Sequence, residues 1–148
     1  MANEISLSFK LAATKNSVTV QNAVQTKVQT MQSDLDAMRA ITQEVASATK
    51  EAVELGDVDA TNASGADYML AMVNRDSTAA VDVYVGFDDS SSQGYIHVGQ
   101  MKPGEPWGPV RLQKATEDTY HTGNIFIAGN GGTALVEVIA VACGNPSA

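Results

Sequence analysis

The stretch that decides the fold runs from Gly123 to Ala142 and reads GNIFIAGNGGTALVEVIAVA. Two apolar runs, residues 123–129 and 134–142, flank the glycine-rich link GNGG at 129–132. A link of that length is typical of a tight hairpin, so we expect the two runs to pair as neighbouring antiparallel strands. The second run is almost entirely apolar, which is typical of a central strand. Its single charge, Glu137, needs a partner or an exit to solvent.

Upstream of this stretch, further short apolar runs are separated by turn residues. They are YMLAMVN at 68–74, AVDVYVGF at 80–87, YIHVGQM at 95–101 and PVRL at 109–112. In the second run, valines alternate with polar residues, which predicts one buried and one wetter face. Short strands at regular spacing are the mark of an all-β sandwich or barrel.

The segment QMKPGEPWGPVRL at 100–112 concentrates three of the four prolines and the only tryptophan. Residues 102–105 predict a β-turn in which Gly104 takes a positive φ. Pro106 and Pro109 donate no ladder hydrogen bond and therefore suit an edge strand. Trp107 is either a plug over the end of the sandwich or an exposed anchor for a partner, and the plug is favoured because small domains use their few aromatic residues in the core.

The N-terminal part carries two different patterns. Residues 3–12 alternate, with Ile5, Leu7, Phe9 and Leu11 on one face, and predict a half-buried strand followed by a turn at 14–17. Residues 18–55 fit both a strand and a helix. Valine and threonine favour strands over 17–30, whereas Ser33 as an N-cap favours a helix over 33–54.

Composition excludes several classes of protein. Nine basic and 17 acidic side chains give a net charge of −8, which argues against binding nucleic acid or anionic lipid. No run approaches the ~20 apolar residues of a membrane helix. The N-terminus has no signal-peptide pattern, so we expect a soluble protein made in a cytoplasm. Cys143 is the only cysteine, which rules out an internal disulfide and a thiolate zinc site.

No motif predicts catalysis, a cofactor or a metal site. His97 lies mid-strand without a nucleophile elbow, and His97, His121 and Cys143 lack zinc spacing. Asp57 and Asp59 begin like a calcium loop, but the sixth and twelfth positions of that loop do not match. Acidic turn residues that bond their own backbone are the favoured interpretation.

Several segments together resemble small virion proteins of tailed bacteriophages. They are MANEISLSFKLAATKNSVTV at 1–20, AVELGDV at 52–58, VNRDSTAAVDVYVGFD at 73–88, IHVGQMKPGEPWGPVRL at 96–112 and ALVEVIAVA at 134–142. The resemblance implies a β-sandwich with a non-enzymatic structural role, and it favours strands over a helix in the ambiguous region. Residues 20–37 depart from the pattern and suggest an insertion or an arm that reaches a neighbouring subunit.

We therefore expect an antiparallel, jelly-roll-like β-sandwich over 38–148 with an extended or partly helical N-terminal arm over 1–37. The expected function is capsid decoration in a virion, as a homo-oligomer bound to other phage proteins; a tail component is the alternative, and a carbohydrate- or ligand-binding module is the second alternative. The interface candidates are Trp107, Arg111, Val24, Val28 and Met31.

Overall fold

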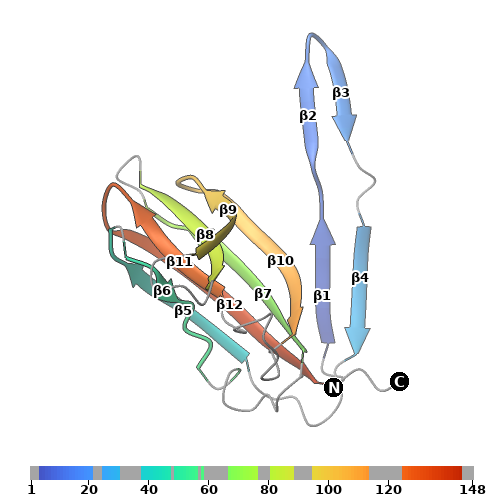
Figure 1. The fold of residues 1–148 in the computed structure, drawn as a ribbon. Helices are drawn as coiled ribbons and strands as arrows, with labels where there is room; N and C mark the ends of the chain where they lie inside the picture. Colours follow the sequence, from blue (N-terminus) through green and yellow to red (C-terminus); the bar gives the residue numbers. More distant parts are fainter. Residues whose placement is uncertain are drawn as a thin grey trace. The chain divides into compact units, whose positions relative to one another are not determined.

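A computed structural model describes residues 4–21, 25–30, 38–47, 49–56, 58, 67–76, 81–88, 95–113 and 125–144. Twelve strands lie in these ranges, and all the pairs that they form are antiparallel, which confirms the all-β fold class (Figure 1). The strands are β1 (Glu4–Phe9), β2 (Ala12–Lys15), β3 (Val18–Gln21), β4 (Gln25–Thr30), β5 (Met38–Val45), β6 (Glu51–Ala52), β7 (Asp67–Asn74), β8 (Asp82–Asp88), β9 (Tyr95–Met101), β10 (Pro106–Gln113), β11 (Ile125–Asn130) and β12 (Ala134–Gly144).

The chain divides into two compact units, Met1–Leu35 and Asp36–Ala148, which we call the hairpin unit and the body. In the hairpin unit, β1 pairs with β4 and β2 pairs with β3. The connection between β2 and β3 is the two-residue turn Asn16–Ser17, where both residues have positive φ values of 50° and 65°. Positive φ at both central residues defines a type I′ turn, whose twist matches that of the flanking strands.

The body contains two four-stranded sheets, one in the order β10-β7-β12-β5 and the other in the order β6-β11-β8-β9. The core is built from alternate residues of these strands. On β12, Ala134, Val136, Val138 and Ala140 are at most 1% exposed, while the residues between them face outward. On β8, Val83 and Val85 are buried and their neighbours Asp82 and Tyr84 are half-buried, as the alternation in the sequence predicts.

The expected hairpin across GNGG is wrong. β11 pairs with β6 and β8, whereas β12 pairs with β5 and β7, so the link joins the two sheets. Both edges of each strand are already occupied, which leaves no edge for pairing the two with each other. The glycines serve the crossing instead: Gly131 has a φ of 87°, and a Cβ on Gly129 would collide with the carbonyl oxygen of Gly132.

The helical option for 33–54 is also wrong over the described part of that range. Residues 38–45 form β5, which pairs along its whole length with residues 134–141 of β12. An apolar stripe at helical spacing cannot compete with eight residues of ladder to a buried strand. The strand predicted at 3–12 is split into β1 and β2, and of the face predicted to be buried, the two described side chains, Phe9 and Leu11, are exposed.

Candidate interaction surfaces

Asn74 joins the two sheets at the end where β9 turns into β10. This residue is fully buried, and its side-chain Nδ2 donates to the carbonyl oxygens of Val81 (2.8 Å) and Met101 (3.1 Å). Its Oδ1 accepts from the backbone N–H of Asp76 (3.0 Å). A buried amide that satisfies backbone groups of separate segments fixes their relative positions.

The turn at 102–105 is held by the same residue. The N–H of Glu105 donates to Lys102 O (2.8 Å), the N–H of Gly104 donates to Asn74 O (2.8 Å), and the N–H of Asn74 donates to Glu105 O (3.1 Å). Gly104 has a φ of 84°, which confirms the predicted β-turn. β10 is an edge strand, as Pro106 and Pro109 predicted.

Trp107 lies half-buried on β10, over Gly99 of the neighbouring β9. A Cβ on Gly99 would be only 2.7 Å from the indole Nε1. Because β9 and β10 belong to different sheets, the ring covers the edge where those sheets meet. The indole therefore packs against β9 and leaves part of its surface exposed.

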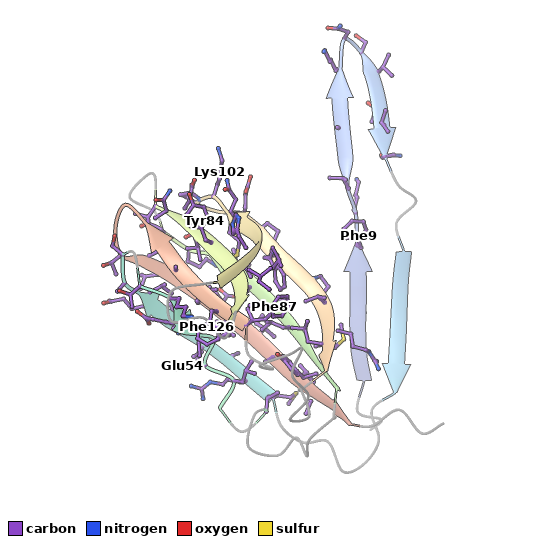
Figure 2. All side chains as sticks on the ribbon, viewed as in Figure 1. Phe9, Glu54, Tyr84, Phe87, Lys102 and Phe126 are labelled. Atoms are coloured by element: carbon purple, nitrogen blue, oxygen red, sulfur yellow. The ribbon has the colours of Figure 1, made fainter. Side chains whose placement is uncertain are left out.

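At the edge where β5 and β6 belong to different sheets, the buried side chain of Gln43 makes hydrogen bonds like those that a paired strand would make. Its Nε2 donates to Ala52 O (3.0 Å), and its Oε1 accepts from the N–H of Glu54 (3.0 Å). Arg39, on the same face of β5, donates from Nε to Glu54 O (3.0 Å) and pairs with the Glu54 carboxylate (3.2 Å; Glu54 is labelled in Figure 2). These bonds connect β5, the edge strand of one sheet, to the end of β6 and the segment after it at the edge of the other sheet.

The outward side of β5 and β12 exposes large apolar side chains, and we call it the outer β5–β12 face. It comprises Met38, Ala40, Thr42 and Glu44 of β5 with Leu135, Glu137 and Ile139 of β12. Met38 is 70% exposed, Leu135 44% and Ile139 43%. Glu137 pairs with Arg75 (2.8 Å), the partner that its position in an apolar strand required.

The outward side of the other sheet carries ring side chains, which the sequence did not reveal as a group. Tyr84 meets His97 edge to face with ring centroids 4.9 Å apart, and its hydroxyl accepts from Asn130 (2.8 Å). The Lys50 ammonium lies 5.4 Å from the Phe126 ring centroid; Figure 2 labels Tyr84 and Phe126. His97 is therefore part of a surface cluster, and its partners are too distant in sequence for any motif to show them.

The hairpin unit exposes apolar side chains from β2 and β3, which we call the hairpin tip (residues 12–21). Alternation and the register Ala13↔Val20 and Lys15↔Val18 place these four residues on one face. Val18 is 64% exposed and Val20 is 71% exposed. The opposite face is polar, and there Thr14 and Thr19 hydrogen-bond to each other (2.8 Å).

The predicted interface candidates that the structure describes belong to two different units. Trp107 and Arg111 are both on β10, where Arg111 is exposed and opposite Met69 of β7. Val28 is on β4, where it pairs with Ser6 of β1. Val24 and Met31 lie outside the described residues.

The candidates for metal chemistry fall mostly outside the described residues, including Asp57, Asp59 and His121; Cys143 lies on β12. Within the described part of the chain, no group of three or more His, Cys, Asp or Glu side chains is placed to hold a metal ion. The same residues contain no helix of the length and apolarity needed to cross a membrane.

Comparison with known proteins gives no relative: no protein-family model, curated protein or solved structure matches this chain.

Proposed function

We propose that this protein is a non-enzymatic structural subunit of a bacteriophage particle, and that it decorates and stabilises the capsid. The observation that carries the proposal is a hairpin unit whose tip exposes valines, in a chain whose buried core lies in a separate unit. A hairpin of two strands gains little stability by itself, so one that exposes valines gains most from a partner surface. A subunit that assembles through such an arm needs no active site.

The strand order of the body supports the proposal. We interpret β5 to β12 as the eight strands of a jelly-roll sandwich. In that interpretation β5, β12, β7 and β10 form one sheet and β6, β11, β8 and β9 form the other. Of the seven connections between consecutive strands, only that from β8 to β9 stays within a sheet. Jelly rolls build viral capsid and lectin domains, and since a fold alone does not fix function, the hairpin is the feature that favours assembly.

The test is an image of purified particles in which this chain carries a label. Decoration predicts label distributed over the head, at a copy number that scales with the number of capsid subunits. Label confined to the tail would mean that the protein is a tail component and not a capsid decoration protein. Particles that lack the chain altogether would contradict both structural roles.

A second experiment addresses Trp107. The Trp107→Ala variant removes the half-buried indole while leaving the hairpin unit unchanged. If the variant remains folded but no longer joins the particle, the exposed part of the ring contacts the capsid. If it unfolds, the ring is required for the body to fold. The Arg111→Ala variant, altered on the same strand, serves as the comparison for loss of a charged contact.

A further inference from the structure

We propose that the hairpin tip of one copy docks on the outer β5–β12 face of a second copy of this chain. This inference rests on the proposed assembly role and deepens it by naming the partner of the hairpin and the surface that receives it. Three features carry it: the apolar face of the hairpin, the apolar face of the sheet, and the opposite charges of the two units.

The hairpin tip has a face that fits an apolar sheet. Val18 and Val20 lie side by side with Ala13, and Lys15 is at the end of this face nearest the turn. The strands on either side of the turn expose every residue, so the valines are in water in the single chain. Burial of apolar side chains such as these valines favours association, which makes this face the favoured docking side.

The outer β5–β12 face has the complementary composition. Apart from Glu137, which pairs with Arg75, the residues of β12 are apolar on both sides, a pattern that is typical of strands covered on both faces. One side is covered by the core, whereas Leu135 and Ile139 on the other side remain more than two fifths exposed. Ile139 lies opposite Ala40 of β5, so apolar side chains on the two strands adjoin. The hairpin valines can pack on these side chains.

Charge favours a contact between the two units over a contact between like units. Residues 1–35 contain Lys10, Lys15 and Lys27 against Glu4 and Asp34, which gives 3 − 2 = +1. The remaining residues, 36–148, therefore carry −8 − 1 = −9. Opposite charges on two docking surfaces speed their encounter and disfavour body-to-body contact.

Individual residues on the two proposed docking surfaces also carry opposite charges. Glu44 is exposed on the outer β5–β12 face, where it lies opposite Leu135. Lys15 lies on the valine face of the hairpin. A hairpin whose valines cover Leu135 and Ile139 brings its lysine toward Glu44. Each copy carries both surfaces, so a second copy supplies the complete match without another protein.

Disulfide trapping between two marked chains tests the arrangement. In a Cys143→Ala background, one chain carries Val20→Cys and the other, distinguished by a size tag, carries Ile139→Cys. We expect a mixed disulfide as the main product under mild oxidation. Thr19→Cys, on the opposite face of the same strand, is the matched control and is expected to give at least tenfold less of it.

Three outcomes of this experiment would overturn the inference. A product that links Val20→Cys only to itself would mean that hairpins pair with hairpins. A link inside a chain carrying both substitutions, formed at a rate independent of concentration, would mean that the hairpin covers its own sheet. A chain that remains monomeric and unlinked at every concentration would mean that neither surface binds a second copy.

A charge exchange in the full-length chain provides independent support. Lys15→Glu is expected to weaken self-association at least tenfold in sedimentation measurements, and adding Glu44→Lys to the same chain is expected to restore it. Lys50→Glu, on the outward side of the other sheet, is the control and leaves association unchanged. Equal association of wild type and Lys15→Glu would contradict the contact with Glu44.

Imaging separates this inference from the proposed function. If labelled particles carry the chain but no mixed disulfide forms, the docking inference fails and the structural role stands. If the mixed disulfide forms but particles lack the chain, self-association stands and the structural role fails.

Discussion

Asn74 shows how one polar residue can determine the junction of two sheets. It is fully buried at the end of β7, and its side chain makes three hydrogen bonds to backbone groups of Asp76, Val81 and Met101. We expect Asn74→Ala to lower the free energy of unfolding by about 3 kcal/mol, because it leaves buried carbonyl oxygens without donors. Urea unfolding measures the change. Asn130→Ala removes a single exposed hydrogen bond and is the control, with an expected loss under about 1 kcal/mol.

Gly99 is the residue on which Trp107 rests, so it determines where the indole lies. The Gly99→Ala substitution places a methyl group 2.7 Å from Nε1, and the ring must move outward. We expect the fluorescence of this single tryptophan to shift to longer wavelength, with a loss of about 1–3 kcal/mol in stability from overpacking. Gln100→Ala, at the exposed neighbouring position, should leave the emission unchanged. An unshifted spectrum for Gly99→Ala would contradict the contact.

At the scale of single elements, one substitution can test how the turn between β2 and β3 contributes to the stability of the hairpin tip. Ser17 has a φ of 65°, a conformation that costs a residue with a side chain roughly 1 kcal/mol. We expect Ser17→Gly to relieve this cost, offset in part by the greater freedom of glycine in the unfolded chain. The net gain of about 0.5 kcal/mol should slow amide hydrogen exchange in β2 and β3 roughly twofold.

The same substitution in a strand is the matched control. Ser6 lies on β1 in extended conformation, where glycine weakens a strand. Ser6→Gly should therefore speed exchange in β1 and β4. If Ser17→Gly also speeds exchange, the Asn16–Ser17 turn does not limit the stability of the hairpin.

At the scale of elements, the sequence predicts the positions of strands more reliably than it predicts which strands pair with each other. The strands after residue 67 follow from alternation and turn residues, and the structure confirms them within a few residues. The GNGG link misled because glycine-rich connections occur both within and between sheets; the neighbours of β11 and β12 decide which applies. β5 could not be assigned from its own residues, because its pairing with β12, far along the chain, excludes the helix.

The candidate surfaces were predictable only where local sequence determines them. The turn at 102–105 and the edge position of β10 follow from proline and glycine chemistry. The cross-sheet bonds of Asn74, the partners of His97 and the outer β5–β12 face depend on residues that only the fold brings together. The structure places Arg111 on β10 of the body and Val28 on β4 of the hairpin unit.

For the whole molecule, the division into two units makes its own prediction. Among the residues with described side chains, every buried one belongs to the body, from Gln43 to Ala142. A chain that lacks residues 1–35 should therefore keep the β-sheet circular dichroism signal of the body and a cooperative unfolding midpoint close to that of the full chain. Because the hairpin tip is gone, the truncated chain should also remain monomeric at concentrations where the full chain associates.

For each measurement on the truncated chain, one result would contradict the proposed separation of folding and association between the two units. Broad, non-cooperative unfolding would mean that residues 1–35 complete the core of the body, and the separation into two units would be wrong. A folded fragment that still associates would mean that the body has its own contact surface, independent of the hairpin. A folded, monomeric fragment requires both that the core is contained in residues 36–148 and that association depends on the hairpin unit. That result would assign folding to one unit and assembly to the other.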